Sequence, residues 1–187
     1  MTYRTMVGGK KATAIYVNEY VRPKRRDRIL DVGCGPAETV KHFSDVEYIG
    51  FDNNPAYIEL AKRRFGDQGH FFCGKIDQVR LKEFGTFDLV LAVGVLHHLD
   101  DSESLSLLKL AYTALKEGGR LVTYDGCFVE GQSRIAQFII SQDRGRFVRS
   151  KDEYLNLACQ VFANVKQELR EDLLRIPYTH LIMECRK

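Results

Sequence analysis

Two adjacent histidines, His97 and His98, carry the side chains best suited to acid–base chemistry in this chain of 187 residues. Histidine ionises near neutral pH, so a positioned imidazole can take a proton from a hydroxyl nucleophile, which accelerates such a reaction by about 10²- to 10⁴-fold. Asp125 and Tyr124 end a later apolar run and are also titratable. We therefore select His97, His98 and Asp125 as catalytic candidates and Tyr124 as a substrate-binding candidate. A loop histidine bonded to a backbone carbonyl explains either ring equally well.

A turn rich in glycine stands near the start of the chain. Residues 29–32 form a short apolar run that predicts a buried strand, and Gly33, Cys34 and Gly35 follow it. Glycine has no side chain, so the backbone there can turn sharply and approach a ligand closely. Pro36 predicts the first residue of a helix, whose free N–H groups would face an anionic group. Strand, turn and helix together predict a cradle for a nucleotide.

An acidic residue follows the second predicted strand, residues 47–51. Asp52 stands 21 positions after Asp31, and a carboxylate about 20 residues beyond such a cradle can accept hydrogen bonds from ribose hydroxyls. Asn54 predicts the N-cap of a helix over residues 55–65. Capping of that helix is the alternative role for Asp52, and the cradle upstream favours the ribose.

Two nucleotide-binding patterns compete at the glycine turn. A dinucleotide fingerprint, G-x-G-x-x-G, requires Gly or Ala at position 38, which is Glu38 in this chain. The stretch instead resembles the first motif of class I S-adenosylmethionine-dependent methyltransferases, an acidic residue followed by G-x-G-x-G. Asp31, Gly33 and Gly35 match that motif, and Ala37 replaces its last glycine. The resemblance implies S-adenosyl-L-methionine as the cofactor.

A second likeness to this family lies further along the chain. The apolar run of residues 87–93 and the Leu-His-His-Leu sequence of residues 96–99 resemble the family's fourth motif. The resemblance implies that Val93 and Gly94 line the methionine part of the cofactor and that the histidine pair stands by the transfer site. Residues 115–122 then resemble the start of the family's fifth strand.

One departure from the family pattern concerns the adenine ring. Members often carry an acidic residue just after the glycine that follows the third strand, here residues 70–73, and this chain has Lys75 there. Asp77 or the backbone of Ile76 is left as the adenine contact. The resemblance covers residues 28–126 and implies the following cofactor-binding residues: Asp31, Gly33, Cys34, Gly35, Asp52, Asn53, Ile76, Asp77, Val93 and Gly94.

The alternation of strands and helices predicts an α/β fold with a doubly wound sheet. Helices are expected over residues 10–21 and 55–65, and from Asp101 or Ser102 to the Gly118-Gly119 pair. Two late strands, residues 165–169 and 179–185, fit the antiparallel pair that the family adds to its parallel sheet. The resemblance implies a Rossmann-like methyltransferase fold of seven strands in the order 3-2-1-4-5-7-6, with strand 7 antiparallel.

The segment beyond residue 126 has no recognisable motif. It contains an amphipathic helix and then three arginines, Arg144, Arg146 and Arg149, which are candidates to hold a phosphate or carboxylate of the acceptor. A solvated surface turn is the more frequent role of such arginines. Ser150 and Glu153 form a capping box at the next helix. We expect one methyltransferase domain over residues 1–187, with an N-terminal helix in 1–22 and an acceptor-side insertion in 127–162.

Composition excludes little. The chain is 44% hydrophobic and 28% charged with a net charge of +3, which suits one compact domain and does not by itself indicate nucleic acid. Five scattered cysteines suggest neither disulfides nor a metal site. The N-terminus lacks a signal peptide and the longest apolar run, residues 89–96, is too short for a membrane span, so we expect a cytoplasmic protein. The basic run of residues 22–28 is expected to be a solvated connector, with phosphate binding as the alternative.

These observations predict a methyltransferase that acts on a small molecule, by O-methylation of an anionic or sugar-like acceptor. Methyltransferases of nucleic-acid bases usually place Asn/Asp/Ser-Pro-Pro-aromatic after the fourth strand, where this chain has residues 96–99. RNA methylation is therefore a weaker alternative. A protein that binds S-adenosylmethionine as a sensor, without catalysis, is a further alternative, and Glu38 disfavours an NAD-dependent enzyme. The identity of the acceptor and the oligomeric state stay open.

Overall fold

Eight strands form one sheet in the computed structural model, which describes residues 9–142 and 145–187. Seven of them follow the order β3-β2-β1-β4-β5-β8-β7, in which β8 is antiparallel to its two neighbours and the other pairs are parallel. The predicted order, with its last strand antiparallel, is therefore confirmed. A short strand, β6, pairs with the end of β5 and was not predicted. The strands are β1 Arg28–Val32, β2 Glu47–Asp52, β3 His70–Cys73, β4 Phe87–Val93, β5 Leu115–Phe128, β6 Arg149–Ser150, β7 Asn164–Arg170 and β8 His180–Arg186.

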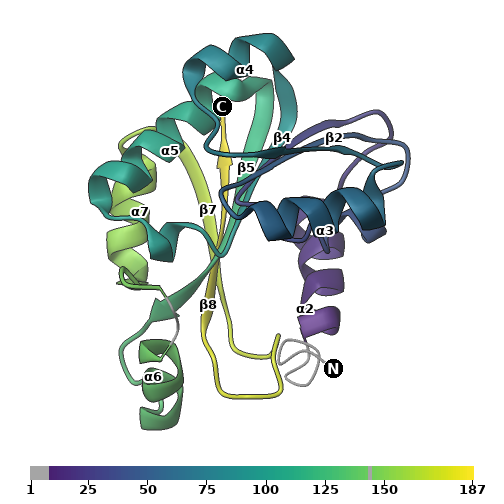
Figure 1. The fold of residues 1–187 in the computed structure, drawn as a ribbon. Coiled ribbons are helices and arrows are strands. Elements are labelled where there is room, and N and C mark those ends of the chain that lie inside the picture. Colours follow the sequence, from purple (N-terminus) through teal and green to yellow (C-terminus); the bar gives the residue numbers. More distant parts are fainter. Residues whose placement is uncertain (1–8, 143–144) are drawn as a thin grey trace.

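Helices cover both faces of this sheet (Figure 1). One face packs against α4, α5 and α7, and the other against the continuous helical segment α2–η1, the short turn η2 and α3. The remaining helix, α6, lies beyond the end of β5, outside both layers. The helical segments are α2 Gly9–Ile15, η1 Tyr16–Val21, η2 Val40–His42, α3 Pro55–Phe65, α4 Gln78–Phe84, η3 Leu96–His98, α5 Asp101–Ala114, α6 Arg134–Ser141 and α7 Lys151–Cys159.

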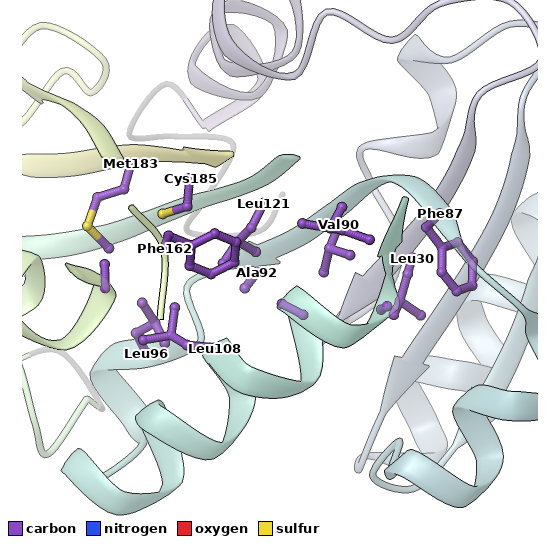
Figure 2. Packing of buried hydrophobic residues seen from close by; sticks show 14 of the residues in the cluster. Leu30, Phe87, Val90, Ala92, Leu96, Leu108, Leu121, Phe162, Met183 and Cys185 are labelled. Carbon is purple, nitrogen blue, oxygen red and sulfur yellow. The ribbon is translucent and has the colours of Figure 1, made fainter. Parts of the chain in front are cut away.

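The central strand β4 is apolar on both sides because both of its faces are covered. Leu89 and Leu91 point into the layer of α2 and α3, whereas Val90 and Ala92 point into the layer of α5. Figure 2 shows the second layer, in which Leu108 of α5 packs below the apolar side chains of the strands. Burial of each large side chain of this kind contributes roughly 1.5–3 kcal/mol. The core thus holds the strand ends, and with them the site, in place.

The helix predicted to begin at Pro36 does not form. Val40–His42, a single 3-10 turn, is the only helical segment described between β1 and β2. Ala37 adopts a left-handed backbone, with φ +54, and its N–H donates to the carbonyl of Cys34 at 2.9 Å. A left-handed residue cannot continue a right-handed helix. The prediction was wrong because the turn needs this conformation at the position where the family pattern has glycine.

The long helix before β5 also differs from its prediction. Its N-cap is Asp100, one residue before the expected cap, and the Asp100 carboxylate accepts a bond from the N–H of Glu103 at 2.8 Å. The helix ends at Ala114 instead of at the glycine pair. Leu115 pairs with Phe87 at the start of β4, so tertiary pairing takes the chain out of the helix four residues early.

Other local predictions are confirmed. Asn54 caps α3, and its side-chain oxygen accepts bonds from the N–H groups of Ala56 and Tyr57. Ser150 and Glu153 form the predicted capping box at the start of α7. Among the residues described, no helix combines the length and apolar character that a membrane crossing requires.

Candidate functional site

The glycine turn after β1 is held between two neighbouring segments. The N–H groups of Gly33 and Cys34 both donate to the carbonyl of Phe51 in β2, at 2.8 and 3.0 Å. Gly33 has φ +74, and a Cβ placed on it would lie 2.6 Å from a methyl carbon of Val95, in the loop after β4. Gly35 has φ +54 and no atom within 4 Å of a Cβ placed on it. The turn therefore needs glycine at one position for close packing and leaves open space at the next.

Asp31 lies at the bottom of this turn with only 1% of its surface exposed. One carboxylate oxygen accepts a bond from the Tyr48 hydroxyl at 2.6 Å. The other oxygen is buried and has no hydrogen-bond partner among the described residues. Burial raises the pKa of Asp31 to about 7, and the neighbouring charge of Asp52 adds to this rise. A buried oxygen without a partner costs free energy, which a cationic ligand would offset.

Asp52 ends β2 and faces the same turn. One carboxylate oxygen accepts the N–H of Gly35 at 2.8 Å, and the other accepts the N–H of Asn54 at 2.8 Å. Because Asn54 is the N-cap of α3, helix capping is not the role of Asp52. Each oxygen keeps a second lone pair for a hydroxyl of a ligand. Asn53 beside it is exposed, and burial raises the pKa of the half-buried Cys34 thiol.

The two residues predicted to contact adenine differ in burial: Ile76 is buried and Asp77 is exposed. Ile76 is 8% exposed, whereas Asp77 is exposed and caps α4 by accepting the N–H of Arg80 at 2.8 Å. Lys75, at the usual acidic position, pairs with Glu103 of α5 at 3.5 Å. The loop after β3 is thereby tied to α5 across the sheet edge. The carboxylate of Asp77 is thus engaged in part, while the backbone of Ile76 stays a cofactor candidate.

The histidine pair lies on the 3-10 turn η3, directly after β4. His97 is 6% exposed, and its Nδ1 lies 2.8 Å from a carboxylate oxygen of Asp125, which also accepts the backbone N–H of His97. A Cβ placed on Gly94 would lie 3.5 Å from Cε1 of the same ring. His98 is exposed, with its ring centroid 4.2 Å from that of His97. The structure thus brings Asp125, His97 and Gly94 together and leaves His98 on the surface beside them.

Gly145 and Phe147, from the segment between α6 and β6, pack against the backbone and ring of His97. A Cβ placed on Gly145 would lie 2.2 Å from Cδ2 of His97 and 2.8 Å from its carbonyl oxygen. The N–H of Phe147 donates to that same carbonyl at 3.0 Å. Sequence reasoning did not select Gly145 or Phe147, because no local pattern announces a contact with a residue so far away in the chain.

Two of the three candidate arginines, Arg146 and Arg149, lie within the described residues, and their surroundings differ. Arg144 lies outside the described residues, and Arg146 is exposed. Arg149 is 7% exposed and bonds to the Asp101 carboxylate at 2.7 and 2.9 Å. Its remaining N–H groups donate to backbone carbonyls. Since all of its donors are used within the protein, the contacts of Arg149 do not support a role in holding the acceptor.

Tyr124 and Asp125 point to opposite faces of the sheet, as neighbouring residues of a strand do. Tyr124 is half-buried, stacks on His180 with ring centroids 4.4 Å apart, and meets the ring of Tyr16 edge-on at 5.3 Å. Burial raises the pKa of Tyr16, and the negative charges of Asp31 and Asp125 raise it further. Tyr124 therefore belongs to an aromatic wall beside the site, apart from the pair formed by His97 and Asp125.

The basic run of residues 22–28 is largely paired with acidic side chains. Arg25 bonds to Asp45 at 2.8 Å, and Arg28 bonds to Glu47 at 2.7 Å. These contacts agree with the connector role. Within the described ranges, no group of three or more His, Cys, Asp or Glu side chains is arranged to hold a metal ion.

Comparison with known proteins points to one family. A sequence profile described as "Methyltransferase domain" matches residues 29–119. The chain is 30% identical over 118 residues to the sterol 24-C-methyltransferase of Aspergillus fumigatus, covering 59% of this chain and 30% of that protein. It is also 30% identical over 139 residues to the aclacinomycin 10-hydroxylase RdmB of Streptomyces purpurascens, covering 67% and 36%.

Solved structures give the same fold. The crystal structure of a TehB-like SAM-dependent methyltransferase from Corynebacterium glutamicum superposes with a TM-score of 0.64 at 22% identity, over 94% of this chain and 88% of that one. By contrast, the matches to the curated relatives extend over only about a third of their length, 30% and 36% for the two named. The matched residues 29–119 carry the glycine turn, Asp52 and the histidine turn. The match over residues 29–119 and the shared fold together support the class I S-adenosylmethionine-dependent methyltransferase family for this chain.

Proposed function

We propose that this chain transfers a methyl group from S-adenosylmethionine to an oxygen of a small-molecule acceptor. The observation that carries the proposal is the pair of His97 and Asp125, joined at 2.8 Å beside Gly94. When bound, the cofactor supplies an electrophilic methyl group on a sulfonium. The protein's share of the reaction is to bind, orient and deprotonate the acceptor.

The residues at the carboxyl ends of β1, β2 and β4 fit such a cofactor. The unpartnered oxygen of Asp31 suits the ammonium of the methionine part, since a charge-assisted bond would satisfy it. Asp52, fixed by two backbone N–H groups, suits the ribose hydroxyls. The open space at Gly35 leaves room for a ligand, and Val93 and Gly94 end the strand next to β1. These contacts support the cofactor assignment inferred from the motifs.

His97 is the general base in this proposal. Asp125 bonds to Nδ1, which orients the ring and favours the tautomer whose Nε2 is free of the ring proton. Cε1 of the ring lies next to Gly94, and Cδ2 lies next to Gly145. Nε2 is bonded to both of these ring carbons and so lies between the two glycines. His98, which is exposed and makes ring contact with His97, is the alternative base.

The acceptor is proposed to be a small molecule. The two curated relatives named above are called a sterol methyltransferase and an aclacinomycin hydroxylase, names that refer to small molecules. The idea of an anionic or sugar-like acceptor keeps less support, because Arg149 is engaged internally and, of the described arginines considered, Arg146 remains exposed. Recognition of an anion would then depend on Arg146.

Transfer is tested by incubating the protein with a cell extract and methyl-labelled S-adenosylmethionine, followed by mass spectrometry. We expect a labelled small molecule and an equal amount of S-adenosylhomocysteine. The label should fall strongly with His97→Gln and depend on the presence of extract. Label found only in RNA, with a steep dependence on salt, would overturn the small-molecule assignment in favour of the nucleic-acid alternative.

A second candidate function is binding of the cofactor without methyl transfer. It is favoured by one observation, the sequence similarity to RdmB, whose name describes a hydroxylase and not a methyltransferase. Calorimetry with S-adenosylmethionine alone, combined with a turnover assay over a metabolite panel, separates the two functions. Tight binding with no S-adenosylhomocysteine formed would support this second function.

A further inference from the structure

We propose that Arg149 is the positioning residue that holds His97 against Asp125. This inference rests on the proposed function, in which His97 takes the acceptor's proton. Arg149 is nearly buried, and it belongs to β6, a strand that the sequence did not predict. It touches neither histidine ring in the contacts described. It acts on them through the backbone of the turn that carries them.

The guanidinium of Arg149 bonds to both ends of the histidine turn. Nη1 donates to the carbonyl of Leu96 at 3.0 Å, and Nη2 donates to the carbonyl of Leu99 at 2.8 Å. Nε and Nη2 also donate to the carboxylate of Asp101, in the first turn of α5. One side chain therefore fixes the residues immediately before and after His97 and His98.

A second path runs through Phe147. Nη1 of Arg149 donates to the carbonyl of Phe147 at 3.0 Å, while the N–H of Phe147 donates to the carbonyl of His97 at 3.0 Å. Gly145 fits against the ring of His97 only because it lacks a side chain. The acceptor-side segment thus reaches the backbone and the ring of His97 together.

Arg149 is itself anchored to the strand that carries Asp125. β6 pairs with Cys127 and Phe128 at the end of β5, two residues after Asp125. The guanidinium lies over the ring of Tyr154 at 5.6 Å, and the hydroxyl of Tyr154 donates to the carbonyl of Gly126 at 3.1 Å. Arg149 therefore connects β5 to the histidine turn, and this connection sets how closely Asp125 and His97 approach.

Lysine could not make the same connection. Arginine presents five N–H donors in a planar fork, and here those donors reach three carbonyls and a carboxylate at once. A lysine ammonium carries three donors on a flexible stem. A lysine at position 149 would keep the positive charge but is not expected to hold His97 in place. Loss of the positioning in Arg149→Lys therefore distinguishes it from an effect of the charge.

The test uses the Nδ1–H proton of His97, which gives a separate low-field signal in the proton NMR spectrum when it is bonded to a carboxylate. His97→Gln assigns the signal by removing it. We expect Arg149→Lys to broaden or shift this signal and to lower turnover by about 10²-fold, the cost of a misplacement near 1 Å. Calorimetry should show unchanged affinity for S-adenosylmethionine, because Asp31 and Asp52 lie on other elements.

Two further variants keep the test decisive. Asp101→Asn weakens the grip of Arg149 at a side chain that is 78% exposed, and it should shift the signal in the same direction by less. If Arg149→Lys does not fold, the NMR signal of Asp101→Asn tests the positioning role instead. Arg170→Lys is the matched control, since Arg170, at the end of the edge strand β7, makes a comparable number of bonds to Glu19, Tyr20 and Asp172. That variant should leave the signal unchanged.

The outcomes separate this inference from the proposed function. An unchanged Nδ1–H signal in folded Arg149→Lys would overturn the positioning role even if the wild-type protein transfers methyl groups. Loss of the signal in that variant would sustain the positioning role even if the wild-type protein forms no S-adenosylhomocysteine, a result that would refute the proposed function alone. Equal effects of Arg149→Lys and Arg170→Lys would also overturn the inference.

Discussion

The cofactor half of the sheet, residues 28–126, and the acceptor-side segment, residues 127–162, place their polar groups in different ways. In the cofactor half, the groups come from neighbouring strand ends, as where the N–H of Gly35 donates to Asp52. In the acceptor-side segment, Arg149 reaches a partner 48 positions earlier in the chain. The candidate site residues of the first region therefore belong to local sequence motifs. The second region contacts these residues only through the tertiary structure.

The largest expected effect tests the cofactor half. Gly33→Val should abolish binding of S-adenosylmethionine, because the new side chain meets Val95 at 2.6 Å and φ +74 strains any residue with a Cβ. Calorimetry should detect no heat of binding. Gly131→Val is the control for strain alone, since Gly131 has φ +73 and open space around a Cβ. Normal binding by Gly33→Val would mean that the turn is not the cofactor cradle.

The next effect lies at the junction of the two regions. His97→Gln should lower turnover by about 10²- to 10⁴-fold, the usual contribution of a positioned base, with little change in cofactor affinity. His98→Ala should cost far less, because the ring that lies 2.8 Å from the Asp125 carboxylate is that of His97. Steady-state kinetics of the two variants measure the difference. The reverse order of effects would assign the base to His98.

Asp31 should give the folded protein a distinct dependence on pH. Burial raises its pKa from 3.8 to about 7, so between these values the folded state keeps a proton that the unfolded chain has released. The contribution of protonated Asp31 to the free energy of unfolding is therefore fully present below pH 3.8, and it is lost as the pH rises through about 7. The slope is at most about 1.4 kcal/mol per pH unit.

This pH dependence is measured by urea unfolding of the wild-type protein and Asp31→Asn over that range. The wild-type protein should lose stability relative to the variant as the pH rises. Bound S-adenosylmethionine should reduce the difference if its ammonium meets Asp31. Parallel curves for the two proteins would show that Asp31 titrates normally.

A smaller effect is expected at the ribose position. Asp52→Ala should weaken the affinity for S-adenosylmethionine by roughly 1–3 kcal/mol, since hydroxyl donors would lose their acceptor. Titration calorimetry gives this value directly, with Glu59→Ala on the exposed face of α3 as the control. Unchanged affinity would remove Asp52 from the cofactor site and weaken the contrast between the regions.

The smallest effect tests whether the acceptor-side segment presses on the site. In Gly145→Ala the methyl group would lie 2.2 Å from Cδ2 of His97 and 2.8 Å from its carbonyl oxygen, so the two segments must move apart. Arg146 and Phe147 are exposed, which lets their segment take up most of this movement. Turnover should therefore fall about tenfold, less than for a 1 Å misplacement of His97 itself. Gly131→Ala again serves as the control. Full activity of Gly145→Ala would show that this contact does not set the position of His97.

The sequence alone identified the parts of the fold that depend on short-range rules. The positions of most strands, the cap at Asn54 and the capping box of Ser150 were predicted correctly because each depends on residues within a few positions of one another. The sheet order followed from the family resemblance. The helix at Pro36 was predicted wrongly, since the left-handed backbone of Ala37 has no local signal.

The tertiary structure alone decided how the candidate residues combine. The sequence named His97 and His98 as equal candidates for the base, with Asp125 behind them, and the fold joined His97 to Asp125 across 28 positions. It also turned Tyr124 and Asp125 to opposite faces of the sheet and engaged the N–H donors of Arg149 within the protein. Residue types and spacing determine which chemistry the chain can carry. Which side chains meet depends on packing between distant segments, because burial and hydrogen-bond geometry select one arrangement among many that the local patterns allow.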